Sequence, residues 1–128
     1  MQLHLIEPLG FSLEEKQLRR SGLDYHDLAR VQTWPDLPTF LADGPHTRIW
    51  VVETGGTRRY DQADFAAGDA LIFGPETRGL KPKQIEQIQG EVISLPMVAG
   101  NRSLNLSNCV SIVAFEAWRQ MEFAGADI

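Results

Sequence analysis

The sequence has little of what disulfides and metal sites require. Its single cysteine is Cys109, so no disulfide can form within the chain. Its three histidines, His4, His26 and His46, stand far apart and lack the spacing of metal-ligand pairs. Such cysteine usage is typical of the reducing cytoplasm, where we expect the protein, with no metal bound. Cys109 lies in a helical pattern, which favours a small buried side chain over a nucleophile.

Long hydrophobic runs and an excess of positive charge are also missing. The longest apolar runs are only a few residues, so no membrane-spanning helix is expected. The first residues lack the basic start and long apolar stretch of a signal peptide. The net charge of −5 gives no general attraction for nucleic acid, so any RNA binding has to come from local basic clusters. The 128 residues are enough for one domain, residues 1–128, with a sizeable core.

The common nucleotide-binding and nucleophile motifs do not occur. There is no GxGxxG and no Walker sequence, so the usual dinucleotide and phosphate cradles are not predicted. Ser103 has no evident histidine partner, which argues against a serine-nucleophile triad.

Short apolar strands alternate with helical segments along the chain. Strands are predicted at residues 3–7, 31–34, 48–53, 69–73 and 92–97, and helices at 12–20, 35–42, 82–88 and 105–121. This alternation predicts an α/β domain with a mostly parallel sheet and helices on both faces.

The last predicted helix is apolar on two faces. Asn105 is a suitable N-cap for it, because its side-chain oxygen can accept from backbone N–H groups at the helix start. One face, by helical spacing, contains Leu106, Val110, Val113, Ala117 and Met121, and a second contains Ile112, Phe115 and Trp118. A helix that is apolar on two sides is buried on two sides, so we predict that one side packs against a second subunit.

Three predicted strands end in polar loops, at residues 54–56, 74–79 and 100–105. Ligands of parallel α/β sheets bind at the carboxyl ends of strands, so the three loops predict one crevice. Gly74 and Gly79 allow close approach of a backbone, and the loop between them is either a ligand site or a solvated turn. Basic residues cluster at residues 19–20, 58–59, 81–83 and at Arg102. Singly each is ordinary surface, but several around one crevice would form a phosphate-binding rim.

Two of these loops resemble motifs of a known superfamily. Residues 72–80 (IFGPETRGL) resemble the second motif of the SPOUT superfamily of RNA methyltransferases. Residues 95–97 (LPM) with 102–108 (RSLNLSN) resemble its third motif. Residues 3–8 and 19–26 are similar to the small, single-domain subgroup that methylates the ribose 2′-hydroxyl of the tRNA wobble nucleotide, a cytidine or a modified uridine.

The resemblance implies a fold, a cofactor and site residues. The fold would be a trefoil-knotted α/β domain, and residues 105–121 would pack it into a homodimer. S-adenosylmethionine would lie bent in the knot, and the substrate would be the tRNA anticodon loop. The implied cofactor-binding residues are Val52, Gly74, Leu95, Met97 and Ser103, and the implied catalytic residues are Glu76, Ser103 and Asn105. The implied RNA-binding residues are Arg19, Arg20, Arg78 and Arg102.

The chain departs from the superfamily at its start. In the family a further strand and helix precede the strand that begins here at Leu3, and they supply an arginine assigned to activating the 2′-hydroxyl. The expected fold is therefore N-terminally truncated. Two functions stay open: a tRNA 2′-O-methyltransferase, and a cofactor- and RNA-binding dimer with impaired catalysis. A fragment that does not fold alone is a third reading. A smaller departure is Phe115, where relatives often have tyrosine.

Overall fold

The computed structural model describes residues 1–7, 31–75, 78–100 and 104–128, and all structural statements concern these ranges. The chain divides into two compact units, residues 1–44 and 45–128. Each unit is described by itself. The helix predicted at residues 12–20 lies outside the described residues, as do Arg19, Arg20 and His26.

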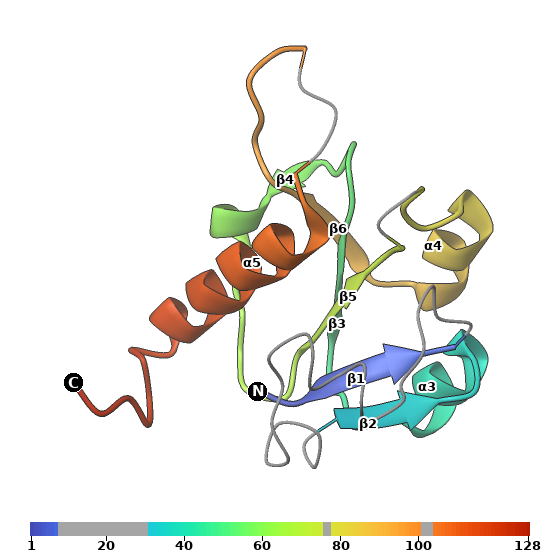
Figure 1. Cartoon of the computed structure of the whole chain (residues 1–128), viewed down its shortest axis with the longest axis horizontal. Helices are drawn as coiled ribbons and strands as arrows, with labels where there is room; N and C mark the ends of the chain where they lie inside the picture. The colour runs from blue at the N-terminus through green and yellow to red at the C-terminus, as the bar shows by residue number, and fades with distance from the viewer. Residues whose placement is uncertain (8–30, 76–77, 101–103) are drawn as a thin grey trace, which may run out of the picture. The chain divides into compact units, whose positions relative to one another are not determined.

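The first unit pairs two short strands in parallel. Strand β1 (Leu3–Ile6) lies beside β2 (Val31–Trp34), with Leu3 opposite Val31 and Ile6 opposite Trp34 (Figure 1). Helix α3 (Leu37–Asp43) follows directly. Its three elements confirm the strands and the helix that the sequence predicts here.

Local chemistry explains how α3 begins and what it packs on. The Asp36 carboxylate caps the helix by accepting the Thr39 N–H at 2.8 Å. Phe40 is buried, and its ring meets Trp34 edge-on with centroids 5.4 Å apart. The Trp34 indole N–H donates to Nδ1 of His4 at 3.0 Å, and burial lowers the pKa of this histidine. His4 is therefore a half-buried hydrogen-bond partner of Trp34 in this unit.

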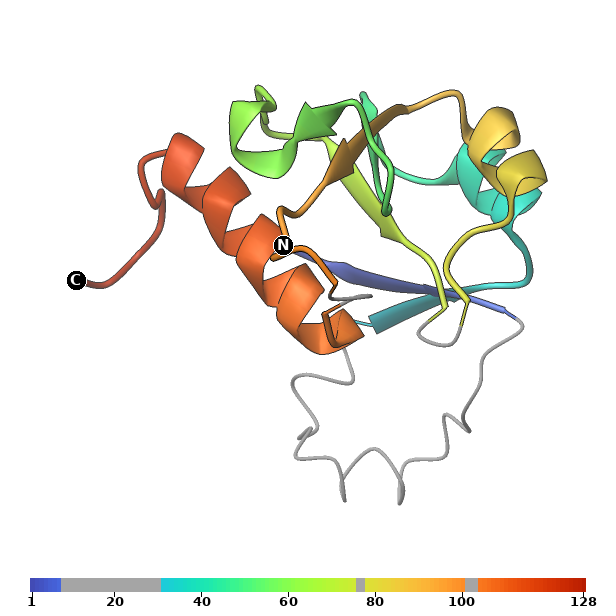
Figure 2. The ribbon, with the colours of Figure 1, turned by 90° about the horizontal axis from the view of Figure 1, so that it is seen from above.

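The second unit is built on a four-stranded parallel sheet in the order β4-β6-β3-β5. Its strands are β3 (Ile49–Val52), β4 (Arg58–Arg59), β5 (Ala70–Phe73) and β6 (Glu91–Ser94). Its helices are the 3-10 turn η1 (Tyr60–Gln62), α4 (Pro82–Ile88) and α5 (Leu106–Gln120). Helices α5 and α4 lie on opposite sides of the sheet, as the two ribbon views show (Figures 1 and 2). This arrangement confirms the mostly parallel α/β prediction, whereas β4 and η1 were not predicted.

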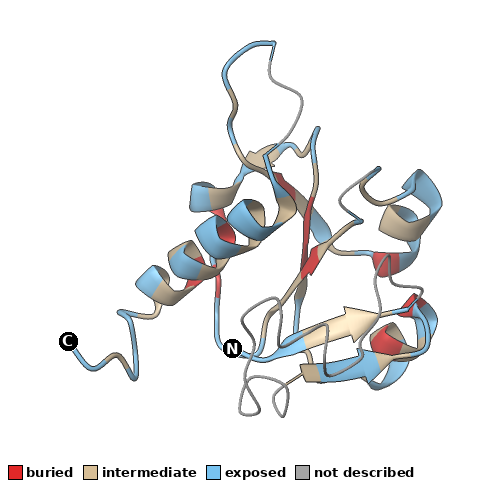
Figure 3. Cartoon of the chain, viewed as in Figure 1, coloured by how far each residue is buried: buried red, intermediate tan, exposed pale blue. Residues whose placement is uncertain are grey.

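The core of the second unit lies between the sheet and α5. Its buried members are Trp50, Val52, Ala63, Phe65, Ile93, Val113 and Ala117. Val113 and Ala117 come from α5, are spaced by one helical turn and belong to the same buried cluster as Trp50, Val52 and Ile93 of the sheet. Figure 3 colours the buried segments red. The first predicted face of the helix is therefore the core face.

On the second predicted face of α5, two large apolar side chains are exposed among the described residues of this unit. Ile112 is 37% exposed and Phe115 is 60% exposed. The Trp118 ring meets Phe115 and Phe123 edge-on, with centroids 5.6 and 5.2 Å away. Cys109 is half-buried on the same helix, and burial raises the pKa of its thiol, as expected of an unreactive side chain. In the described part of the chain, no helix has the length and apolar character needed to cross a membrane.

Candidate functional site

The carboxyl ends of three neighbouring strands lie at one edge of the sheet. Strand β3 is flanked by β5 and β6, and all three run parallel. Val52 at the end of β3 is in register with Phe73 of β5 and with Ile93 of β6. The loops that follow these strands therefore leave the sheet at the same level. The common level of the strand ends agrees with the prediction, and a single crevice between the three loops stays a prediction.

Glu53, directly after β3, holds the loop that follows β5. One carboxylate oxygen accepts the backbone N–H of Leu80 at 2.8 Å, and the other accepts the N–H of Thr54 at 3.1 Å. A side chain at Gly79 would place its Cβ 2.7 Å from the first of these oxygens. Sequence reasoning counted Glu53 as the last strand residue and missed this role. The one available signal was a carboxylate placed between an apolar strand end and a Gly-rich loop.

Ser94, at the end of β6, joins the first loop to the sheet. Its hydroxyl donates to the carbonyl oxygen of Glu53 at 2.5 Å and accepts the Gly56 N–H at 2.6 Å. A Cβ at Gly56 would lie 2.7 Å from the same hydroxyl and 2.9 Å from the Val92 carbonyl oxygen. Only glycine fits there, so the loop after β3 is fixed against β6.

The loop after β5 folds back on itself through two glycines. A Cβ at Gly74 would lie 2.4 Å from the Leu80 nitrogen and 2.5 Å from the Gly79 carbonyl carbon. Gly79 has φ +69° and donates its N–H to the Pro75 carbonyl oxygen at 2.9 Å. The close approaches that these glycines allow are to backbone and to Glu53. The described ends of this loop, residues 74–75 and 78–80, are thus held close together.

The predicted cofactor-binding residues that the structure describes lie at this edge. Val52 is buried, and Gly74, Leu95 and Met97 are half-buried. Leu95 packs against the core cluster. Ser103 lies outside the described residues.

Two glycines in the segments that follow β3 and β6 have open space around the position of a side chain. Gly55 has φ +81° and Gly100 has φ +92°, and nothing lies within 4 Å of a Cβ built on either. The edge therefore combines apolar strand ends with approachable main chain. This combination suits a cofactor that carries an adenosine group.

Asn105 is the one predicted catalytic residue in the described part of the chain. Its side-chain oxygen accepts the Ser107 N–H at 2.9 Å and the Ser107 hydroxyl at 2.6 Å. The predicted N-cap of α5 is therefore confirmed. Glu76, Ser103 and Arg102 fall outside the described residues, and a catalytic role for Asn105 stays a prediction.

The basic clusters differ in how their charges are used. Arg58 pairs with Glu91 at 2.9 Å, and Arg59 forms an ion pair with Asp61. The hydrogen bonds and charge of Asp61 raise the pKa of Arg59. These two arginines are thus partly neutralised by protein carboxylates. Arg78, Lys81 and Lys83 are exposed, at the end of the β5 loop and the start of α4.

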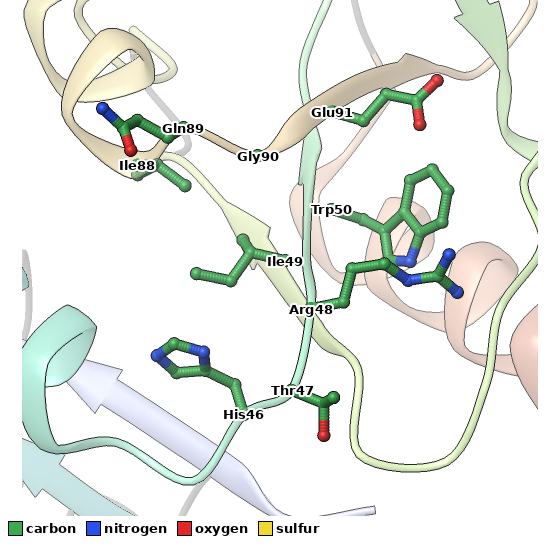
Figure 4. Close-up of a pocket in the computed structure, with 9 residues that line it drawn as sticks. All are labelled: His46, Thr47, Arg48, Ile49, Trp50, Ile88, Gln89, Gly90 and Glu91. Atoms are coloured by element: carbon green, nitrogen blue, oxygen red, sulfur yellow. The ribbon is translucent and has the colours of Figure 1, made fainter.

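A cavity of about 380 Å³ lies at the opposite edge of the sheet, beside the amino ends of β3 and β6 (Figure 4). In it the Arg48 guanidinium lies 4.8 Å from the Trp50 ring centre and 2.9 Å from an Asp69 oxygen. Burial alone would raise the pKa of Asp69, but hydrogen bonds from Arg48, Trp50 and the Ala66 N–H hold it below its ordinary value. This network stabilises the start of the sheet and is separate from the strand-end loops.

Comparison with known proteins identifies the family. The model of the SpoU rRNA methylase family matches residues 1–115. The chain belongs to the SpoU rRNA methylase family. The SPOUT resemblance seen in the two loop motifs is thereby confirmed.

Curated and solved SpoU relatives extend this result. The chain is 45% identical, over 126 residues, to the tRNA (cytidine(34)-2′-O)-methyltransferase of Aeromonas hydrophila, covering 98% of this chain and 81% of that protein. A solved structure described as giving insight into 2-OH methylation of C/U34 on tRNA is 36% identical, with a TM-score of 0.84, and the match covers 95% and 80% of the two chains. The SpoU methyltransferase AviRb of Streptomyces viridochromogenes, solved in complex with AdoMet, shares the fold at 20% identity with a TM-score of 0.75, over 96% of this chain and 51% of that one.

Proposed function

We propose that this protein transfers a methyl group from S-adenosylmethionine to the ribose 2′-hydroxyl of nucleotide 34, a cytidine or modified uridine, in tRNA. The observation that carries the proposal is the 45% identity over 98% of the chain to a tRNA (cytidine(34)-2′-O)-methyltransferase. The 36% identical solved structure concerned with C/U34 supports the same nucleotide. An unpaired anticodon loop suits the reaction, because its nucleotides can be splayed outward into a site.

The cofactor would bind at the strand-end loops. Val52, Gly74, Leu95, Met97 and Ser103 would surround it, largely through backbone groups. Support for this location comes from the register of β3, β5 and β6 and from the open backbone at the strand-end glycines. When bound, S-adenosylmethionine supplies an electrophilic methyl group on a sulfonium.

The chain's own task is to orient the ribose and assist loss of its proton. A ribose hydroxyl is a poor nucleophile, and general-base assistance typically contributes 10²–10⁴-fold. Glu76, Ser103 and Asn105 are the residues proposed for this work. Alignment of the 2′-oxygen with the methyl group accounts for much of the remaining rate, because positioning removes an entropic barrier. Capping by Asn105 fixes the start of α5 and so the position of this residue.

The RNA backbone would contact the basic residues that the family resemblance implies. Arg19, Arg20, Arg78 and Arg102 are proposed to bind phosphates. The exposure of Arg78, with Lys81 and Lys83 close in sequence, is consistent with a positive rim beside the β5 loop. Such contacts compensate locally for the net charge of −5.

The assembly would be a cytoplasmic homodimer of single, trefoil-knotted domains. Residues 105–121 are proposed to form the dimer contact. Support comes from the second face of α5, where Phe115 is 60% exposed and Ile112 is 37% exposed. Large apolar side chains grouped on one helix face are typical of an interface.

Incubation with methyl-labelled S-adenosylmethionine and unmodified tRNA tests the reaction. We expect label on the ribose of nucleotide 34, located by nuclease mapping. The matched control is the same tRNA with a 2′-deoxyribose at that nucleotide, which should accept no label. Label at another nucleotide would contradict the proposed substrate. Binding of cofactor and tRNA without any transfer would instead favour the impaired, binding-only dimer.

A further inference from the structure

We infer that Glu53 is a positioning residue of the methyl-donor site, acting through the loop after β5. This inference rests on the proposed function only for the identity of the cofactor. The hydrogen bond between Glu53 and Leu80 is observed at the carboxyl ends of the strands and does not depend on that identity. Glu53 does not belong to the two loop motifs by which the superfamily was identified.

Residue 53, at the end of β3, forms hydrogen bonds with the end of β6 and with the loop after β5. Its N–H donates to the Ile93 carbonyl oxygen of β6 at 3.1 Å, and its carbonyl accepts the Ser94 hydroxyl. Its carboxylate accepts the Leu80 N–H from the β5 loop and the Thr54 N–H from its own loop. Displacing this one side chain would therefore remove the hydrogen bond that joins the β5 loop to the end of β3.

The chemistry of the contact requires a carboxylate. An ionised carboxylate only accepts, so it satisfies both N–H groups at once, whereas a glutamine of the same size has one acceptor and one donor. With glutamine, the NH₂ group would face the backbone N–H of either Thr54 or Leu80. Both of these groups are hydrogen-bond donors, so one of the two hydrogen bonds would be lost and the two N–H groups would repel each other. Within the described ranges, Glu53 forms no ion pair with a cationic side chain. The partners of its carboxylate there are the backbone N–H groups of Thr54 and Leu80.

Two glycines bring the described ends of this loop together. Gly79 lies under the carboxylate at φ +69°, and Gly74 packs on the Leu80 nitrogen. Loss of the Leu80 hydrogen bond would allow Leu80 to move away from Gly74. Gly74, one of the proposed cofactor-binding residues, lies at the start of this loop. The expected consequence is weaker cofactor binding without global unfolding.

The first test measures cofactor affinity of Glu53→Gln by calorimetry. We expect S-adenosylmethionine and S-adenosylhomocysteine to bind about tenfold more weakly, equally for both, which corresponds to about 1.4 kcal/mol. Asp69→Asn is the matched control, because it also exchanges a hydrogen-bonded carboxylate for an amide, at the opposite edge of the sheet. The control should melt at a lower temperature and keep wild-type affinity for both ligands.

Three results would overturn the inference. The first is wild-type affinity in Glu53→Gln. The second is an equal loss of affinity in Asp69→Asn, since the effect would then be general destabilisation. The third is a loss confined to the sulfonium ligand, which would make Glu53 a direct electrostatic contact.

The second test does not depend on the cofactor. Amide hydrogen exchange of the ligand-free protein should be faster at Leu80 in Glu53→Gln than in the wild type, and unchanged at Leu80 in Asp69→Asn. Wild-type exchange at Leu80 in Glu53→Gln would overturn the Glu53 contact. A different result would count against the proposed function instead. In that case the wild type would not bind S-adenosylmethionine, although exchange at Leu80 was still slower in the wild type than in Glu53→Gln.

Discussion

A single methyl group at Gly74 should disable the proposed cofactor site. In Gly74→Ala the new Cβ would lie 2.4 Å from the Leu80 nitrogen and 2.5 Å from the Gly79 carbonyl carbon. Both neighbours are backbone atoms, so no side-chain rotation can relieve the overlap. Glu53 holds Leu80, and the Pro75 carbonyl holds Gly79, so the whole turn has to move.

The size of that movement follows from the contact distances. Ordinary van der Waals contact begins at 3.4 Å, so a neighbour at 2.4 Å must retreat by about 1 Å. Overpacking of this kind costs about 1–3 kcal/mol in the free energy of unfolding. A misplacement of 1 Å in a catalytic arrangement can lower the rate about 100-fold. We therefore expect a modest loss of stability and a much larger loss of kcat/KM.

The assay compares two alanine variants made on the same sheet. Gly90→Ala is the control, because its Cβ would lie 2.7 Å from the Ile49 carbonyl oxygen, at the opposite edge from the loops. Denaturant melts should place both variants below the wild type. Labelled methyl transfer to tRNA should fall about 100-fold in Gly74→Ala and stay near the wild-type value in Gly90→Ala.

Two outcomes would refute this reasoning. Wild-type kcat/KM in Gly74→Ala would mean that the turn does not position the site. An equal loss of activity in Gly90→Ala would mean that activity follows sheet stability, whatever the location of the change.

Three further predictions concern the end of the third loop, the dimer face and the start of the sheet. Asn105→Ala should lower the free energy of unfolding by about 1 kcal/mol through loss of the N-cap and strongly reduce methyl transfer. Asn105→Asp should keep the helix N-cap but should not recover the methyl transfer lost in Asn105→Ala. Recovery of transfer would mean that Asn105 acts only as the N-cap. Phe115→Glu should sediment as a monomer with unchanged stability, since the side chain is 60% exposed, and a dimer would contradict the α5 interface. The folded pKa of Asp69 lies below its unfolded value, so its contribution to stability is present above the unfolded pKa and lost as pH falls through the folded pKa. Urea melts should therefore show Asp69→Asn less stable than wild type at neutral pH, with the difference shrinking in acid below the ordinary value of 3.8; a constant difference would contradict this.

Most elements could be predicted from sequence because their boundaries are encoded locally. Helix α4 has the bounds that the pattern predicts, since a proline opens it and Gln89, in the left-handed region at φ 57°, closes it. Strand β4 was missed for the opposite reason. Arg58 and Arg59 have no apolar alternation, and their pairing with Ile93 and Ser94 is decided by the tertiary fold.

The common level of the strand ends was predictable from sequence, and the contacts that join their loops were less so. Parallel strands place their carboxyl ends together, so apolar runs followed by polar loops were enough to locate the edge. The role of Glu53 depends on Leu80, 27 positions further along the chain. No local pattern reveals a bond between a side chain and a distant backbone N–H. The family resemblance also could not supply it, because Glu53 lies outside the motifs that carry that resemblance.

The glycines at the sheet edge fall into two groups with different physical roles. Gly56, Gly74 and Gly79 are closed, because a Cβ on any of them would overlap neighbouring atoms at under 3 Å. Gly55 and Gly100 are open, with nothing within 4 Å. Alanine at a closed glycine must displace a loop, whereas alanine at an open one costs only the left-handed strain of about 1–2 kcal/mol. The closed group therefore fixes how these segments pack against one another, and the open group leaves its backbone accessible.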